Sequence, residues 1–138
     1  MTEVIKKVLW LDDLRDPNDV LWKDYIPLYF SCELTWVKNY DDFCDWIIKN
    51  GLPTTICFDH DLGSDISREK VKNGMSKSRA RKEKIGTKTG MDAAKWLVDY
   101  CIDNDLDLPM WIIQSANPVG KDNINGILTS YRKFRALN

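Results

Sequence analysis

Three short apolar runs stand out along the chain, and each of them ends in polar residues. They span residues 7–11, 55–58 and 110–114, and a weaker fourth run spans residues 34–37. Near-continuous apolar runs of this length are typical of strands in a parallel sheet that is covered on both faces. The pattern therefore predicts four strands, each followed by a polar connection.

Helical patterns separate these runs. Residues 40–49 and 121–134 place apolar side chains at helical spacing, and residues 90–104 carry a longer apolar stripe with Thr89 as the expected N-cap. Residues 16–30 contain two prolines, which predict a loop with a short or irregular helix. The resulting order, β-α-β-α-β-α-β-α, predicts an α/β fold with an open parallel four-stranded sheet flanked by helices.

Length and composition narrow the class of protein. The chain has 138 residues, which we interpret as a single domain spanning residues 1–138. The first residues precede no long apolar stretch, and no apolar run is long enough to cross a bilayer. The four cysteines form no CxxC pair and lie in apolar segments, which favours reduced, buried thiols. We therefore expect a cytoplasmic protein without a membrane partner.

Charge is unevenly distributed along the chain. The formal net charge is only −1, but residues 64–88 contain nine basic and three acidic residues and carry +6, so the rest of the chain carries −7. This segment is too polar for a core and is predicted to be a basic insertion between the third strand and its helix. The low total charge excludes a protein that is basic throughout, as many nucleic-acid-binding proteins are.

The polar residues that follow the strands are the candidates for chemistry, because ligands of open α/β sheets bind at the carboxyl ends of the strands. They are Asp12, Asp13, Asp59, His60, Asp61, Ser115 and Asn117. If the first and third strands are neighbours, three or four carboxylates converge there, and such a cluster favours Mg²⁺ or Mn²⁺. The alternative interpretation is that these residues only form turns and cap helices.

Four ordered motifs carry a resemblance to a known family. The acidic pair Asp12-Asp13, Asp59 after the third strand and Ser115 after the fourth resemble a response-regulator receiver domain, although the chain has no Lys-Pro pair on a fifth strand. The fuller pattern more closely resembles the divergent cyclic-phosphate-processing receiver domain. Its motifs are Leu-Trp-Leu-Asp-Asp-Leu-Arg-Asp-Pro (9–17), Phe-Asp-His-Asp-Leu-Gly (58–63), Thr-Gly-Met-Asp-Ala-Ala-Lys-Trp-Leu (89–97) and Ser-Ala-Asn-Pro-Val-Gly (115–120).

The resemblance implies both a fold and an activity. The fold is receiver-like (flavodoxin-like) without the usual fifth strand. The activity is that of a metal-dependent phosphoesterase that hydrolyses a cyclic phosphate of a small nucleotide-derived molecule, such as ADP-ribose cyclic phosphate from RNA repair. Carried over, Asp12, Asp13 and Asp59 bind the metal, Asp59 is the phosphoacceptor-like position, and Ser115 contacts phosphate.

Further roles follow from what phosphodiester hydrolysis requires. His60, the only histidine, can move a proton, because histidine exchanges protons near neutral pH. Asp61 either orients His60 or supports the metal. In the alternative geometry, strand alternation turns His60 away and leaves Asp59 and Asp61 at the site.

Substrate contacts are expected from two further places in the sequence. Ser115 and Asn117 can donate hydrogen bonds to phosphate. Thr89 and Gly90 lie at a helix start, where backbone N–H groups bind anions, and Lys88 precedes them at the end of the basic insertion.

The basic insertion leaves three interpretations open: a lid that binds a small phosphorylated nucleotide, a solvated loop, or a nucleic-acid contact. Two rival functions follow, namely a non-catalytic receiver-like signalling or interaction module and a nucleic-acid-binding accessory protein. The sequence makes no prediction of the oligomeric state.

Overall fold

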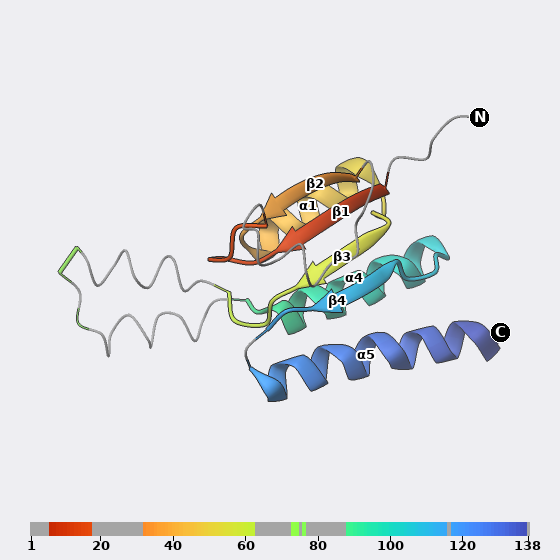
Figure 1. Cartoon of the computed structure of the whole chain (residues 1–138). Coiled ribbons are helices and arrows are strands. Elements are labelled where there is room, and N and C mark those ends of the chain that lie inside the picture. Colours follow the sequence, from red (N-terminus) through yellow and green to blue (C-terminus); the bar gives the residue numbers. More distant parts are fainter. Residues whose placement is uncertain are drawn as a thin grey trace.

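A four-stranded parallel sheet forms the centre of the molecule. The computed structural model describes residues 6–17, 32–62, 73–74, 76, 88–115 and 117–137. The strands are β1 (Lys6–Leu11), β2 (Cys32–Val37), β3 (Thr55–Phe58) and β4 (Met110–Ile113), in the order β2-β1-β3-β4. Figure 1 shows all four strands pointing to the same edge of the sheet. The predicted parallel α/β sheet is confirmed.

The strand order determines where a ligand site can form. From β1 the chain first builds β2 on one side and then β3 and β4 on the other, so the order reverses between β1 and β3. In register, Leu11 at the end of β1 lies opposite Val37 of β2 and Phe58 of β3. Parallel sheets bind ligands beyond the carboxyl ends of the strands at such a switch point. The residues after Leu11 and Phe58 therefore lie at the position where a site is expected.

Three described helices pack on one face of this sheet. They are α1 (Tyr40–Asn50), α4 (Gly90–Asn104) and α5 (Pro118–Leu137). All three contribute to one core cluster together with Leu9, Leu11, Ile56 and Phe58 of the strands. The expected N-cap of α4 is confirmed, because Thr89 accepts a hydrogen bond from the Asp92 amide in a capping box.

Helix α5 begins earlier than the sequence pattern predicts. Its apolar stripe predicts a start at residue 121, but the helix begins at Pro118, and the side-chain oxygen of Asn117 accepts a hydrogen bond from the Gly120 amide at 3.0 Å. Proline is favoured in the first turn of a helix, where its missing N–H costs nothing, and asparagine is a preferred N-cap. An Asn-Pro start therefore brings the helix close to the end of β4.

The opposite face of the sheet has its own small core. Val8, Trp10 and Cys57 are buried there, with Leu34, Trp36 and Ile112 packed against them. The helix expected within residues 16–30 falls largely on residues outside the described ranges. Cys44, Cys57 and Cys101 are buried free thiols, as predicted, and burial raises the pKa of Cys57 to about 12.

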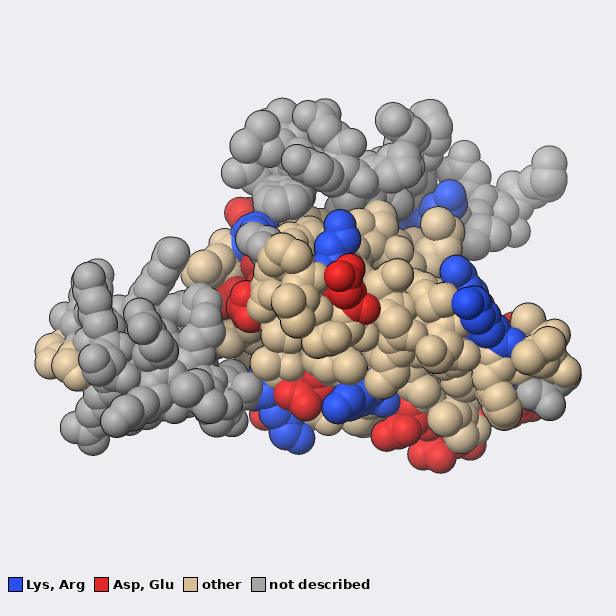
Figure 2. Space-filling model, turned by 90° about the horizontal axis from the view of Figure 1, so that it is seen from below, with Lys and Arg blue, Asp and Glu red and all other residues tan. Residues whose placement is uncertain are grey.

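The described helices bear on the expectation that no segment crosses a membrane. In the described ranges, no helix is both long enough and apolar enough to do so. Figure 2 shows Lys and Arg side chains interspersed with Asp and Glu side chains on the described part of one face. Almost all of the basic insertion at residues 64–88 lies outside the described residues, so its three interpretations stay predictions.

Candidate metal and phosphate site

The turn after β1 is built around the side chain of Asp12. Its Oδ1 accepts hydrogen bonds from the backbone amides of Leu14 at 3.0 Å and Arg15 at 2.9 Å. Two indole groups hold the same turn from the sheet, since Trp36 donates to the Asp12 carbonyl at 2.7 Å and Trp10 to the Arg15 carbonyl at 2.9 Å. Buried indole N–H groups need such acceptors, so the tryptophans both fill the core and fix the turn.

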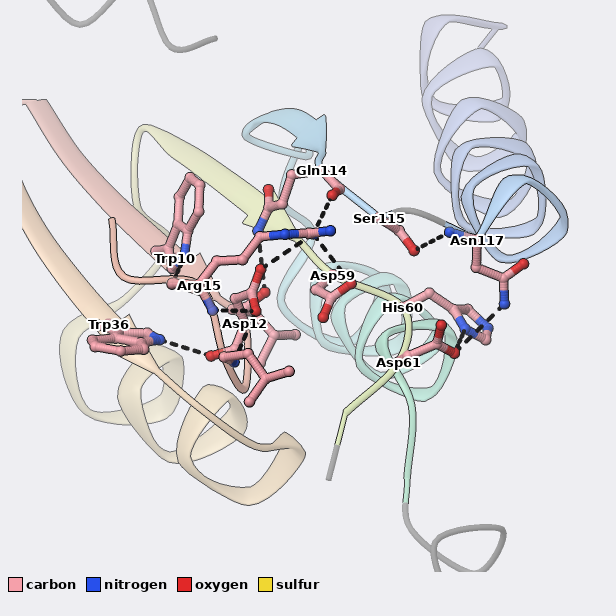
Figure 3. A network of polar contacts seen from close by, with 12 residues as sticks. Trp10, Asp12, Arg15, Trp36, Asp59, His60, Asp61, Gln114, Ser115 and Asn117 are labelled. Carbon is pink, nitrogen blue, oxygen red and sulfur yellow. Dashed lines mark hydrogen bonds and ion pairs between the residues drawn. The ribbon is translucent and has the colours of Figure 1, made fainter. Parts of the chain in front are cut away.

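This turn brings Asp12 and Asp13 next to Asp59, which directly follows β3. One carboxylate oxygen from each residue lies within 4.8 Å of the others, and all three residues are buried. Figure 3 shows Asp12 and Asp59 approaching each other from the ends of neighbouring strands. The structure thus brings together the three residues that the sequence predicts to bind a metal.

Burial and mutual repulsion make these carboxylates difficult to ionise together. Burial, followed by the charges of Asp12 and Asp13, raises the pKa of Asp59 to about 7. Burial also raises the pKa of Asp12, against the lowering effect of its hydrogen bonds from the Arg15 and Leu14 amides. Buried like charges relax either by keeping a proton or by gaining a cation.

One oxygen of Asp12 indicates a cation more directly. Among the described residues, Asp12 Oδ2 and Gln114 Oε1 are the two buried side-chain oxygens without a hydrogen-bond partner. An unsatisfied buried carboxylate oxygen is costly, and a hard cation such as Mg²⁺ or Mn²⁺ takes oxygen ligands of this kind. The donor set therefore fits a divalent cation held by Asp12, Asp13 and Asp59.

Arg15 is a site residue to which the sequence pattern assigns no role. Its Nη1 lies 3.6 Å from Asp12 Oδ2 and 3.9 Å from Asp59 Oδ1, and it donates a hydrogen bond to the backbone carbonyl of Gln114 after β4. The side chain thus spans the ends of three strands (Figure 3). The signal in the sequence is an arginine two residues after the acidic pair, and it does not show how far the side chain reaches.

His60 and Asp61 form a second group beside the carboxylates. His60 Nδ1 lies 2.9 Å from Asp61 Oδ1, and Asn117 Nδ2 donates to the same oxygen at 3.5 Å. Figure 3 shows this group on the α5 side of Asp59, with Arg15 on the other side. Asp61 is not in the metal-ligand cluster and contacts His60 instead, and its role in orienting the ring stays a prediction.

Helix α5 accommodates the His60 ring because residue 120 is a glycine. A Cβ at Gly120 would lie 2.3 Å from His60 Cγ, so any larger residue there must displace the ring. His60 therefore packs against the first turn of α5, close to its Asn117 cap. The glycine lies within a motif used for the resemblance, but the sequence gives no sign that it faces His60.

Ser115 and Asn117 build the link between β4 and α5. Ser115 Oγ accepts a hydrogen bond from the Asn117 amide at 3.1 Å, a contact that does not use its hydroxyl hydrogen. The side chain of Asn117 caps α5 through its oxygen and contacts Asp61 through its nitrogen. Both residues lie at the carboxyl edge of the sheet, and their predicted contact with phosphate stays a prediction.

The start of α4 contacts the chain itself rather than open solvent. Gly90 N donates to the His60 carbonyl at 2.8 Å, and Thr89 N donates to Asp92 Oδ2 at 2.8 Å. Lys88 places its ammonium group 4.3 Å from the ring centre of Tyr40. These N–H groups, which the sequence assigns to anion binding, are thus engaged by protein acceptors, and a role of Lys88 toward substrate stays a prediction.

Comparison with known proteins gives a match to one family model over most of the chain. The family model described as the cyclic-phosphate processing receiver domain matches residues 7–130, a range that contains every residue of the site. A search of curated proteins found no significant match to the chain.

Proposed function

Because the chain belongs to the family of cyclic-phosphate processing receiver domains, we propose that it is a divalent-metal-dependent phosphoesterase. Its substrate is the cyclic phosphate of a small nucleotide-derived molecule, such as ADP-ribose cyclic phosphate. The buried Asp12, Asp13 and Asp59 cluster with its unsatisfied oxygen carries this proposal.

The proposed reaction adds one water to the cyclic diester. The water oxygen forms a new P–O bond, one ring P–O bond breaks, and the sugar oxygen that leaves takes up a proton, which gives a phosphate monoester and a free hydroxyl group. Asp12, Asp13 and Asp59 would hold a divalent cation, which would neutralise charge on the phosphate and lower the pKa of water. The protein must then position the phosphate and move one proton.

His60 is the proposed carrier of that proton. Its contact with Asp61 fixes the ring, since a carboxylate that accepts from one ring nitrogen sets the tautomer at the other. His60 takes the proton from the attacking water and returns it to the leaving oxygen, so the net reaction consumes no acid or base. Ser115 is the proposed donor to a phosphate oxygen.

The test is turnover of defined cyclic phosphates with and without metal. Purified protein is incubated with a 2′,3′-cyclic nucleotide or ADP-ribose cyclic phosphate plus Mg²⁺ or Mn²⁺, and the product is followed by phosphorus NMR. We expect a phosphate monoester that forms only with metal and not with a chelator. Metal binding without turnover of any cyclic phosphate would instead support a non-catalytic receiver-like module.

A variant of His60 tests its role within this reaction. His60→Ala should lower kcat by about a hundredfold or more, because proton transfer by a positioned side chain contributes that much. Mn²⁺ affinity should be unchanged, because His60 is not among the clustered carboxylates. A kcat close to that of the wild type would limit His60 to a structural role.

A further inference from the structure

We propose that Arg15 exchanges partners on ligand binding: its guanidinium is the counter-ion of the carboxylate cluster until a divalent cation arrives, and then binds the substrate phosphate. This inference rests on the proposed function and assigns the phosphate-binding cation of the site. Arg15 is anchored at the edge of the sheet beside the carboxylates, where it and a divalent cation would compete for the same oxygens.

The backbone of Arg15 is held from two sides. Its amide donates to Asp12 Oδ1 at 2.9 Å, and its carbonyl accepts from the Trp10 indole at 2.9 Å. The side chain then crosses to the end of β4, where Nη1 donates to the Gln114 carbonyl. Because these anchors do not involve the carboxylates of Asp13 or Asp59, they can persist when those carboxylates change partner.

The ion pairs of the guanidinium with Asp12 and Asp59 are long. Nη1 lies 3.6 Å from Asp12 Oδ2 and 3.9 Å from Asp59 Oδ1, whereas charge-assisted N–H···O bonds are about 2.7–2.9 Å long. The side chain is 30% exposed, so part of it reaches solvent at the carboxyl edge of the sheet. These two ion pairs are longer than charge-assisted hydrogen bonds, so the guanidinium neutralises charge on Asp12 and Asp59 at a distance that leaves room for a cation to compete.

A divalent cation and Arg15 compete for the same oxygens. Asp12 Oδ2 is the oxygen closest to Arg15 in the salt bridges of this site and is also the unsatisfied oxygen that fits a metal. A cation bound there repels the guanidinium and takes its acceptors. The Gln114 carbonyl keeps Arg15 at the edge of the sheet, where its donors can turn to an anion.

The chemistry of the substrate suits such a donor. A cyclic phosphate presents two non-bridging oxygens that gain negative charge as water attacks, and the planar guanidinium matches two such oxygens at once. No other Lys or Arg among the described residues forms a salt bridge with a cluster carboxylate. Arg15 is thus placed to bind the phosphate on the side of Asp59 opposite His60 (Figure 3).

The experiment separates metal binding from anion binding. Arg15→Gln and Arg15→Lys are compared with the wild type by calorimetry, first with Mn²⁺ alone and then with inorganic phosphate in the presence of Mn²⁺. Arg132→Gln is the matched control, because this arginine stacks on Trp111 of β4 away from the carboxylates. Near-ultraviolet circular dichroism checks that each variant is folded, and Arg15→Lys preserves the charge if Arg15→Gln is poorly folded.

The two titrations should change in opposite directions. Arg15→Gln should bind Mn²⁺ about three- to tenfold more tightly, because a competing positive charge has gone. The same variant should bind phosphate about ten- to a hundredfold more weakly, the range expected on loss of hydrogen bonds to a charged group. Arg15→Lys should bind phosphate with intermediate affinity, and Arg132→Gln should match the wild type in both titrations.

Two outcomes would overturn the exchange. Unchanged phosphate affinity in Arg15→Gln would show that Arg15 does not bind the anion, and weaker Mn²⁺ binding in a folded variant would show that it supports the metal site instead. Wild-type protein that binds Mn²⁺ and phosphate without hydrolysing any cyclic phosphate would contradict the proposed function alone. Wild-type protein that binds neither ligand would contradict both proposals.

Discussion

At the scale of single residues, the site is defined by how unequally the two oxygens of Asp12 are used. Oδ1 holds the turn through two backbone amides, and Oδ2 is buried without a hydrogen bond. One side chain thus holds the turn and offers an oxygen to the proposed metal, which makes Asp12 a poor choice for mutation because the turn would be lost as well. Asp59 belongs to the same cluster, where its Oδ1 lies 3.9 Å from Arg15 Nη1.

Asp59→Asn should therefore separate stability from activity. We expect it to abolish metal-dependent turnover, since one ligand charge has gone, and to leave the protein folded. In chelator at neutral pH the variant should be more stable than the wild type, because a buried, repelled charge is removed. Urea unfolding and the turnover assay measure the two effects, and activity close to that of the wild type would refute the metal assignment.

The same residue should make stability depend on pH. The pKa of Asp59 is raised from 3.8 to about 7, so the folded state holds this proton more tightly than the unfolded state. Its contribution to the free energy of unfolding therefore falls as pH rises from about 4 to about 7, by up to about 1.4 kcal/mol for each pH unit. In chelator, the difference in stability between Asp59→Asn and the wild type should widen across this window, and equal slopes would contradict it.

At the scale of elements, helix starts position the proposed catalytic groups. Asn117 caps α5 and reaches Asp61, and the Gly90 amide at the start of α4 donates to the carbonyl of His60. A Cβ at Gly90 would lie 1.9 Å from the Asp59 carbonyl oxygen, so α4 approaches the end of β3 as closely as a glycine allows. Both helices thus fix the short segment that carries Asp59, His60 and Asp61.

Gly120→Ala tests this coupling on α5, with Gly126→Ala as its control on the same helix. The new Cβ at position 120 would lie 2.3 Å from His60 Cγ and must displace the ring, whereas a Cβ at position 126 meets nothing within 4 Å. We expect Gly120→Ala to lower kcat by about ten- to a hundredfold, as misplaced catalytic groups do. Gly126→Ala should leave kcat unchanged and stabilise the helix by about 1 kcal/mol or less. Equal kcat values for the two variants would show that the position of His60 is unimportant.

The sequence predicts the elements better than their connections. Apolar runs and helical stripes identify all four strands and the three described helices, because burial imposes those periods. The start of α5 is missed because its first turn, at Pro118–Gly120, lies outside the apolar stripe. The proposal that Asp59 and Asp61 share one face assumes a strand that continues, but β3 ends at Phe58, so alternation does not apply to the residues that follow.

At the scale of the whole molecule, the sheet order explains why distant motifs meet. Asp12 and Asp59 are close because β1 and β3 are neighbours. The sequence predicts the carboxylate cluster only if these two strands pair, and the sequence pattern does not itself show the pairing. Arg15 adds a link from the first turn to the end of β4, 99 residues further along the chain. Such side-chain reach depends on rotamers and packing, so the sequence pattern could not reveal it.

A cation bound at this meeting point should stabilise the whole fold. Mn²⁺ at a hundred times its dissociation constant should add about 2.7 kcal/mol to the free energy of unfolding, because binding is restricted to the folded state. Thermal melting should show a higher Tm with Mn²⁺ than with chelator in the wild type and no such rise in Asp59→Asn. Asp103→Asn, which alters an exposed aspartate near the end of α4, should keep the full rise. A rise of equal size in Asp59→Asn would place the cation elsewhere.

The two indole groups that hold the turn after β1 also give the protein an intrinsic optical signal. Trp10 and Trp36 donate to the carbonyls of Arg15 and Asp12, so any shift of these two residues changes the surroundings of a fluorophore. Tryptophan emission spectra should therefore change when a divalent cation binds to the carboxylates, without a label, a substrate or a coupled assay. The two tryptophans that pack under the site are thus the side chains expected to respond when a cation binds to it.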